Sequence, residues 1–501
     1  MAPLHRTSDF SSGRPLCNRT VSYFPPIKES TGMFYYPPGP ITTLAAYKNR
    51  HSPVILEEYE PDAIAGLYVH LRKFVCHPHS WTREQYVDSF KDNPGKHRAY
   101  GIVLDKLKAY GKPVSMVTAF TKLEKLTTTK YKAPRLIQAR HASFNIEYGK
   151  FIKPLEQFLT KYHHRRHNFG KGSYDEIARR VAKLSRKFTY YTEADHSTFD
   201  AHVTVEMLRL SHTFYMSCYK HNKDLIQLAR QTIYNRCKTR DNDRYCVRGT
   251  RMSGDVDTSL GNCLINYALL KNLLVVLRIN GDVIVNGDDS IIFSDQPLPI
   301  EMCRLFLRKY NMETVFKPSV TNIHQVEFCK LKYIINADGN STMMMDPNRL
   351  IKIFGMTHRD VPYNEYLCEI LIANAAIHKA NIIGLAFSNC IEILREDITI
   401  PDKLRAKLTS GNLKYIEYKI KRKIERNRSN IRLTCSNYIT NNFVAWPYID
   451  KFSSDLRLIL KRIRFIMKLE SYNLGKLNQQ KILHHIITNH ENRTIAIISA
   501  I

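Results

Sequence analysis

Two apolar runs meet at an acidic turn in the stretch Val283-Ile284-Val285-Asn286-Gly287-Asp288-Asp289-Ser290-Ile291-Ile292-Phe293. Apolar runs on either side of Asn-Gly predict a β-hairpin. Neighbouring aspartates at the tip of a buried hairpin repel each other and lose hydration, unless a divalent cation neutralises them. Asp288 and Asp289 therefore predict a cation site, with Mg²⁺ as the simplest occupant because it takes oxygen ligands and acts on phosphates. Taken alone, the sequence Asn286-Gly287-Asp288-Asp289 could equally form a solvated turn without a cation.

A second acidic pair lies upstream of the hairpin. Asp195 follows the run Tyr190-Tyr191-Thr192, and aromatic residues and threonine favour a strand. We therefore expect Asp195 to stand at the end of a strand, where its carboxylate can face the neighbouring hairpin. Asp200 follows five residues later, just before a predicted helix over residues 203–219.

A polar loop lies between these two acidic segments. It starts at Ser253-Gly254 and leads into an apolar helix that begins near Cys263. Thr258 and Asn262 are four residues apart, which places them on one helical face. The apolar window 263–279 is interrupted by Asn266 and by charged residues, so we expect a buried helix rather than a membrane span.

Three patterns follow one another along the chain: Asp-x4-Asp, Ser-Gly-x3-Thr-x3-Asn and Gly-Asp-Asp. In this order they resemble motifs A, B and C of the RNA-dependent RNA polymerases of positive-strand RNA viruses. The amino-acid sequences of three segments are similar to those of the tombusvirus-like polymerases: Phe199–Val203, Arg251–Asp255 and Val326–Lys330. The resemblance spans about residues 120–335. It implies an α+β right-hand polymerase fold, with fingers, a palm built on a small antiparallel sheet, and a helical thumb. Asp257 departs from the pattern, since these enzymes more often have Asn there.

The resemblance also implies roles for the acidic residues. Asp195 and Asp288 would bridge two Mg²⁺ or Mn²⁺ ions about 3.5–4 Å apart, with Asp289 beside them. In reverse transcriptases, an aromatic residue at the position of Asp200 excludes a ribose 2′-hydroxyl. Asp200 can instead accept that hydroxyl in a hydrogen-bond network. The implied nucleotide-binding residues of this network are Asp200, Ser253, Thr258 and Asn262.

A basic segment over residues 120–140 is similar to motif F of the same polymerases. Arg135 is the candidate for the triphosphate because its planar fork matches phosphate oxygens, and Lys122, Lys132 and Arg140 would lie alongside. A solvated basic loop is the alternative. Lys317 is a candidate for the acid that protonates pyrophosphate.

An amphipathic helix is predicted over residues 173–187. Apolar Ile177, Val181 and Leu184 share one face, and Arg179, Arg180 and Lys183 lie on the opposite one. The nearby run His163–His167 lacks a second ligand pair at zinc-finger spacing, which favours a surface or fold-supporting role.

The chain has 501 residues, long enough for about three domain-sized units. Its formal net charge of +29 predicts a polyanionic partner. Eleven cysteines without a C-x-x-C pair favour a reducing cytosolic compartment. The expected units are an extended N-terminal arm (1–50), fingers (51–187, where 120–140 admits nucleotides), a palm (188–340, with a fingers insertion at about 220–250) and a helical, basic thumb (341–501).

The sequence thus predicts a viral polymerase that replicates a positive-strand RNA genome by template-directed ribonucleotidyl transfer. Its expected partners are a single-stranded RNA template, nascent RNA, ribonucleoside triphosphates and other viral replication proteins. Family resemblance implies the host cytoplasm, at membrane-associated replication complexes, with only indirect or peripheral membrane contact. An RNA-templated DNA polymerase and a basic RNA-packaging protein on an inactive palm are the alternatives.

Overall fold

The computed structural model describes residues 34–124, 133–335, 340–346, 349–350, 356–357 and 363–379, together with 18–19, 21–22, 384, 387–388 and 391. Lys132, most of the expected arm before residue 34 and the basic part of the expected thumb beyond residue 391 lie outside the described residues. Within the described part, helices and strands are mixed along the chain, which confirms the α+β class.

A four-stranded antiparallel sheet contains the predicted hairpin. Its strands, in the order β11-β6-β10-β9, are β11 (Thr314–Phe316), β6 (Tyr190–His196), β10 (Asp289–Ser294) and β9 (Gly281–Asn286). Pairing of Asn286 with Asp289 leaves Gly287 and Asp288 as a two-residue turn. Gly287 has a φ of 68°, and a positive φ at the first turn position favours glycine. The hairpin and the small antiparallel sheet are both confirmed.

Side chains alternate between the two faces of this sheet, because successive residues of a strand point in opposite directions. On β6, His196 faces the long helix α11 (Thr258–Val276), and Asp195 therefore belongs to the opposite face. That opposite face packs through Ile291 on α7 (Tyr174–Ser185), the predicted amphipathic helix. The aspartates thus lie on the face away from α11.

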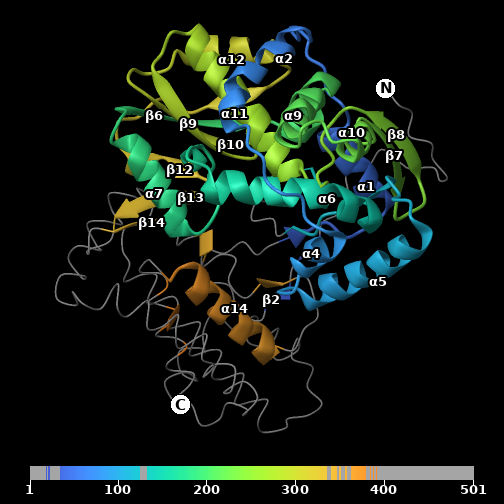
Figure 1. Cartoon of the computed structure of the whole chain (residues 1–501). Helices are drawn as coiled ribbons and strands as arrows, with labels where there is room; N and C mark the ends of the chain where they lie inside the picture. The colour runs from blue at the N-terminus through green and yellow to red at the C-terminus, as the bar shows by residue number, and fades with distance from the viewer. Residues whose placement is uncertain are drawn as a thin grey trace, which may run out of the picture.

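A three-stranded antiparallel sheet lies next to α7 (Figure 1). Its strands are β12 (Glu327–Phe328), β13 (Leu331–Ile335) and β14 (Ser341–Met345). Phe328 of β12 and Ile284 of the hairpin pack with the apolar side of α7 in one buried cluster. The sequence predicts that the fingers end at residue 187, which assigns α7 to the fingers. In the structure, however, α7 packs with the strands that follow it in the chain.

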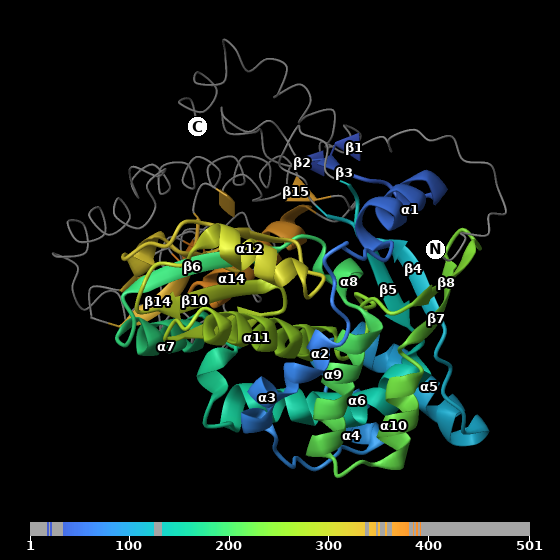
Figure 2. The same ribbon diagram turned by 90° about the horizontal axis from the view of Figure 1, so that it is seen from above.

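A second four-stranded sheet lies at the other side of the molecule from α7 (Figures 1 and 2). Its order is β5-β4-β7-β8, with β5 (Leu136–Arg140), β4 (Val117–Thr121), β7 (Tyr234–Thr239) and β8 (Arg244–Arg248). The strands β4 and β7 are parallel, and the other neighbours are antiparallel. The basic segment 120–140 therefore shares one sheet with residues from the expected insertion at 220–250.

Residues 40–51 differ from the expected extended arm. They form α1 (Pro40–Ala46) and a π-helical turn (Tyr47–His51), because Pro40 fits a first helical turn and Leu44 and Tyr47 are buried. The other helices are α2 (Ala63–Gly66), α3 (Tyr68–Leu71), α4 (Arg83–Asp88), α5 (Pro94–Tyr110), α6 (Ala142–Gln157), α8 (Phe199–His202), α9 (Val205–Cys218), α10 (Lys223–Arg230), α12 (Ile300–Arg308) and α14 (Tyr363–Ile377). Two short strand pairs are β1 (Asn18–Arg19) with β3 (Phe34–Tyr35) and β2 (Val21–Ser22) with β15 (Met356–Thr357).

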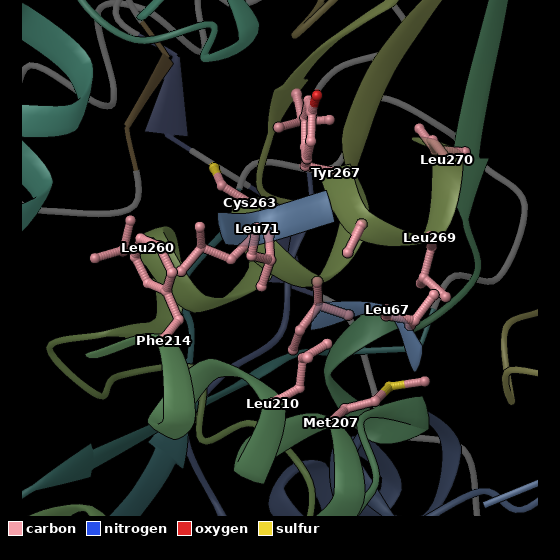
Figure 3. Packing of buried hydrophobic residues seen from close by; sticks show 14 of the residues in the cluster. Leu67, Leu71, Met207, Leu210, Phe214, Leu260, Cys263, Tyr267, Leu269 and Leu270 are labelled. Carbon is pink, nitrogen blue, oxygen red and sulfur yellow. The ribbon is translucent and has the colours of Figure 1, made fainter. Parts of the chain in front are cut away.

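The main apolar core surrounds α11. In Figure 3, Leu260 of this helix lies beside Phe214 of α9, whereas Tyr267 points away from α9, and both belong to the same buried cluster as Leu71 of α3. By length and composition alone α11 could cross a membrane, yet 72% of its apolar window is buried inside the protein. The prediction of a buried core helix is confirmed, and this helix supports the sheet from one side.

A buried ion pair joins the loop before α11 to the start of this helix. Arg251 Nη1 donates to Asp257 Oδ2 at 2.7 Å, and both side chains are at most 1% exposed. The hydroxyls of Tyr148 and Tyr215 also donate to that oxygen, each at 3.3 Å. Asp257, the residue that departs from the family pattern, is thus the counter-ion of a buried guanidinium.

Replacing Arg251 with Leu would leave the carboxylate of Asp257 buried without a counter-ion. We expect the free energy of unfolding to fall by about 3–5 kcal/mol, measured by urea denaturation followed by circular dichroism. Arg304→Leu is the matched control, because the exposed pair between Arg304 and Glu301 contributes at most about 1 kcal/mol. Equal losses in the two variants would contradict the stabilising role of the buried pair.

Candidate active site

The structure brings the three predicted catalytic aspartates together. Asp195 and Asp289 are direct partners in the antiparallel pairing of β6 with β10. Asp288 occupies the turn next to Asp289, and both Asp195 and Asp288 are exposed to solvent. The non-local pairing of two strands therefore places one carboxylate beside the two that are adjacent in sequence.

The electrostatics of this cluster fit a cation site. Burial, followed by the charges of Asp288 and Asp195, raises the pKa of Asp289 to about 6. Within the described residues, no three His, Cys, Asp or Glu side chains are already close enough to ligate one metal ion. The donor set still matches a hard divalent cation, because it offers only carboxylate oxygens and carries an excess of negative charge.

A buried chain of hydrogen bonds holds the turn from the side of α11. Asn266 Nδ2 donates to the backbone oxygens of Gly287, at 2.9 Å, and Asp288, at 3.2 Å. Asn266 Oδ1 lies 3.0 Å from His196 Nε2, and His196 Nδ1 lies 2.7 Å from Thr314 Oγ1. Because the Asn266 amide faces two acceptors, its oxygen must face the ring, so Nε2 carries the proton.

These contacts connect β6, β11 and α11 to the acidic turn. Burial lowers the pKa of His196, so the ring stays neutral and adds no charge to the site. Sequence reasoning missed both His196 and Asn266 as site residues. The signal for Asn266 was available, because it is a polar residue inside the most apolar run of the chain.

Two cysteine thiols flank the same turn. The backbone N–H of Gly287 donates to Cys263 Sγ at 3.1 Å, and Asn286 Nδ2 donates to Cys329 Sγ at 3.2 Å. Burial, reinforced by the charge of Asp289, raises the pKa of Cys329 to about 12, and burial also raises the pKa of Cys263. Both thiols are therefore neutral groups at the edge of an acidic site.

Asp200 pairs with Asn262 as the sequence predicts. Asn262 Nδ2 donates to Asp200 Oδ1 at 2.8 Å, and Arg251 Nε donates to Asn262 Oδ1 at 3.2 Å. Burial raises the pKa of Asp200 to about 6, although the hydrogen bond from Asn262 opposes the rise. The pair is thus held in place by the buried guanidinium of Arg251.

Ser253 and Thr258 do not join this pair. The Ser253 hydroxyl donates to the backbone oxygen of Leu136 at 3.0 Å and accepts from the backbone N–H of Gln138 at 3.1 Å. Thr258 Oγ1 donates to the backbone oxygen of Met252 at 2.7 Å. Ser253 does not join the expected network in this structure, because the Ser253 hydroxyl attaches the loop to β5.

Arg135 and Lys122 lie together at the edge of the β5-β4-β7-β8 sheet. Both are about 40% exposed, and they share Glu124 at 3.5 Å and 3.3 Å, respectively. Sequence reasoning missed Arg50, which interacts electrostatically with both Arg135 and Asp288. Burial and then the charge of Arg135 lower the pKa of Arg50, and Asp288 opposes the shift. Arg50 Nη1 also donates to the backbone oxygen of Ala133 at 3.4 Å, which places Arg50 against the basic segment.

Arg140 has a different environment from the expected triphosphate contact. Its side chain is fully buried and forms a two-pronged ion pair with Asp255, at 2.9 Å and 2.8 Å. It also donates to Asn235 Oδ1 at 2.7 Å and to the backbone oxygen of Ser115 at 2.8 Å. With its donors engaged inside the protein, Arg140 supports the fold, and its contact with nucleotide stays a prediction that these bonds do not favour.

Lys317 stays a prediction as the acid for pyrophosphate. Its ammonium forms an ion pair with Glu193, which is two residues before Asp195 on the same face of β6. Lys132 lies outside the described residues, so the structure does not test it.

Cation binding at the turn should depend on pH. A cation competes with the proton of a carboxyl whose pKa is about 6, so affinity should fall as the pH drops below 6, by up to about tenfold per pH unit. Mn²⁺ binding measured by electron paramagnetic resonance should strengthen with pH and level off above about pH 7. Asp289→Asn should remove this dependence, and Asp295→Asn, the same change at the far end of β10, should retain it. A pH-independent affinity in the wild type would contradict the assignment.

Comparison with known proteins places the chain in a family. The family described as viral RNA dependent RNA polymerase matches residues 56–431, which is more than half of the chain. The RNA-directed RNA polymerase of Maize chlorotic mottle virus is 33% identical over 317 residues, covering 57% of this chain and 32% of the relative. The corresponding protein of Turnip crinkle virus is 32% identical over 278 residues, covering 51% and 34%.

The RNA-directed RNA polymerase of Tobacco necrosis virus (strain A) is 28% identical over 317 residues, covering 57% of this chain and 42% of the relative. The chain therefore spans less than half the length of each of these relatives. The matched residues include the aspartate motifs, and the resemblance drawn from them is confirmed. The chain belongs to the family of viral RNA-dependent RNA polymerases.

Proposed function

We propose that this chain catalyses template-directed ribonucleotidyl transfer and copies the single-stranded RNA of a positive-strand virus. The observation that carries the proposal is the pairing of Asp195 with Asp289 across β6 and β10, beside Asp288, in a chain of this family. An RNA template, nascent RNA and ribonucleoside triphosphates are the substrates that this reaction requires.

The three aspartates, Asp195, Asp288 and Asp289, would hold Mg²⁺ or Mn²⁺ through their carboxylate oxygens. When bound, two such ions activate a 3′-hydroxyl and neutralise the charge of the leaving pyrophosphate. The contribution of the protein is to keep the carboxylates together despite their repulsion. Strand pairing fixes Asp195 against Asp289, and Asn266 fixes the backbone of the turn.

Asp200 and Asn262 are proposed to recognise the ribose of the incoming nucleotide. A carboxylate can accept a hydrogen bond from a 2′-hydroxyl, and Asn262 holds Asp200 in place at 2.8 Å. A deoxyribonucleotide lacks that hydroxyl and would leave buried polar groups unpaired, which disfavours it. This pair supports an RNA product over a DNA product.

Arg135, Lys122 and Arg50 are proposed to bind the triphosphate, together with Lys132. Arg135 and Lys122 share a single carboxylate, Glu124, so their charges are only partly compensated. A triphosphate would replace Glu124 as their partner, and Arg50 would extend the contact toward Asp288. Lys317 is proposed as the acid for pyrophosphate.

The right-hand arrangement of the family suggests how the described sheets divide. We assign the β11-β6-β10-β9 sheet to the palm and the β5-β4-β7-β8 sheet to the fingers, with residues 341–501 in the thumb. Replication in the host cytoplasm, at membrane-associated complexes with other viral replication proteins, belongs to the same proposal.

Incorporation of labelled ribonucleotides on a defined RNA template tests the reaction. With Mg²⁺ or Mn²⁺, the wild type should make template-length product, and Asp288→Ala and Asp289→Ala should lower the rate by at least about 10²–10³-fold, because charge stabilisation is lost. Asp295→Ala is the matched control and should stay active. Tight RNA binding without incorporation by the wild type would favour the packaging-protein alternative, and normal incorporation by Asp288→Ala would refute the site.

Sugar selection gives a separate test. In Asp200→Ala and Asn262→Ala, the ratio of kcat/KM for a ribonucleotide to that for its deoxyribonucleotide should fall by about 10- to 100-fold, as expected for one lost hydrogen bond. Single-nucleotide incorporation measures both constants. Asn272→Ala changes the same residue type farther along α11 and should keep the wild-type ratio. An unchanged ratio with a lower overall rate would assign the pair to folding alone.

A further inference from the structure

The outer side of α7 bears two adjoining hollows that the polymerase site does not use. One, of about 560 Å³, lies between α7 and residues 161–167, and the other, of about 780 Å³, lies between α7 and the start of β14. Arg179 and Lys183 line both hollows, which therefore form one continuous depression, called here the α7 groove. Its cations are Lys161, Arg166, Arg179, Lys183, Arg186 and Lys187.

These cations are exposed, and they outnumber the two acidic residues of the groove. None of the six forms an ion pair with an acidic side chain in the part of the chain that the structure describes. The two acidic residues of the groove have other contacts: Glu176 accepts from the backbone N–H of Ser173, and Asp175 accepts from Thr342. Arg179 and Lys183 lie one turn apart on α7, and Arg186 and Lys187 follow directly after its last residue, so four positive charges are close together.

Arg180 differs from its neighbours on α7. It was expected on the polar face, but it is buried and donates to the backbone oxygens of Thr160, Phe169 and Lys171. These bonds attach the residues on both sides of the 161–167 segment to the helix. The floor of the groove is therefore fixed. The exposed cations above it have only weak contacts within the protein: Arg179 Nε donates to the backbone oxygen of Asp175, and Lys183 Nζ lies near His167 Nδ1, both at 3.4 Å.

Two aromatic rings stand at one end of the groove. Tyr162 is 71% exposed, and the exposed ring of His164 stacks on buried His163 with centroids 4.2 Å apart. Burial lowers the pKa of His163 to about 4, so this supporting ring stays neutral. Cationic grooves with exposed rings are typical of sites for single-stranded nucleic acid, where phosphates meet cations and bases stack on rings.

The groove is separate from the acidic turn. Val181 and the other apolar residues of α7 pack against Ile284 and Ile291 of the hairpin, so the cations face away from the strands that carry the aspartates. A single-stranded RNA bound in the groove would pass along the outside of α7. It would contact a different part of the RNA from the residues being copied.

We propose that the α7 groove binds single-stranded RNA outside the polymerisation site and holds a template while another part of it is copied. Retention of a template rests on the proposed polymerase function, but the binding itself does not. An anionic membrane fits less well, because the groove is concave and Tyr162 is the one strongly exposed large apolar side chain among residues 161–187.

The test removes four charges from the full-length protein in the variant Arg179→Gln/Lys183→Gln/Arg186→Gln/Lys187→Gln. Binding of a labelled, unstructured RNA of about 30 nucleotides is measured by fluorescence anisotropy between about 50 and 200 mM salt. Each lost phosphate contact should reduce the slope of log K against log salt by about 0.7, so the slope should decrease in magnitude by about 2 to 3. Affinity at about 100 mM salt should fall at least tenfold.

The matched control removes the same charge elsewhere, in Arg98→Gln/Lys106→Gln/Lys108→Gln/Lys112→Gln on and after α5. It should retain most of the affinity and slope, and an equal loss would overturn the proposal by assigning binding to overall charge. Tyr162→Ala, which changes no charge, should weaken RNA binding and leave the salt slope unchanged. If the groove variant binds RNA normally but loses binding to vesicles with anionic lipid, the groove is a membrane site and the proposal fails.

Binding and catalysis are separated by the template length. The groove variant should incorporate nucleotides normally on a template of about 8 nucleotides and show a higher KM on a long one, because only the long template reaches the groove. Loss of incorporation on both would overturn the proposal. If the wild type makes no product while the groove variant still loses RNA affinity, the proposed polymerase function fails and the binding site stands.

Discussion

A single carboxamide makes the acidic turn possible. Asn266 uses both amide hydrogens on the backbone of Gly287 and Asp288, and its oxygen is fixed by His196. The two aspartates of the turn repel each other and Asp195, so the backbone that carries them must be held by neutral groups. A charged support would alter the field that a cation meets, whereas an amide and a neutral imidazole do not. The backbone of the acidic turn therefore depends on a buried amide of α11.

The sequence predicts the parts of this site that are local and misses those that depend on packing. The hairpin follows from Asn-Gly between apolar runs, and the facing of Asp195 and Asp289 follows from the order of the motifs. Arg135 and Arg140 look alike in sequence, but alternation along β5 turns Arg140 inward toward Asp255, a residue 115 positions away. Arg50 gives no local signal, because its role comes from a helical turn in a segment rich in turn formers. Such distant partners are set by tertiary packing.

Charge is distributed unevenly over this very basic chain. The acidic turn is a small negative site in a protein with a net charge of +29, and bound cations would cancel part of its negative charge. Positive groups near the turn include Arg50 and Lys330, whereas those of the α7 groove lie on the outer side of the helix. Long-range attraction brings a polyanion to the protein as a whole, and local carboxylates decide where chemistry can occur.

The two thiols beside the turn have a consequence for chemical reactivity. Alkylating reagents and oxidants attack the thiolate, and a cysteine whose pKa is raised to about 12 forms almost none at neutral pH. Cys329 can therefore accept a hydrogen bond next to Asp289 without becoming a reactive nucleophile. Peroxide would oxidise exposed, low-pKa thiols first, and the sulfur atoms nearest the acidic turn would be among the last to change.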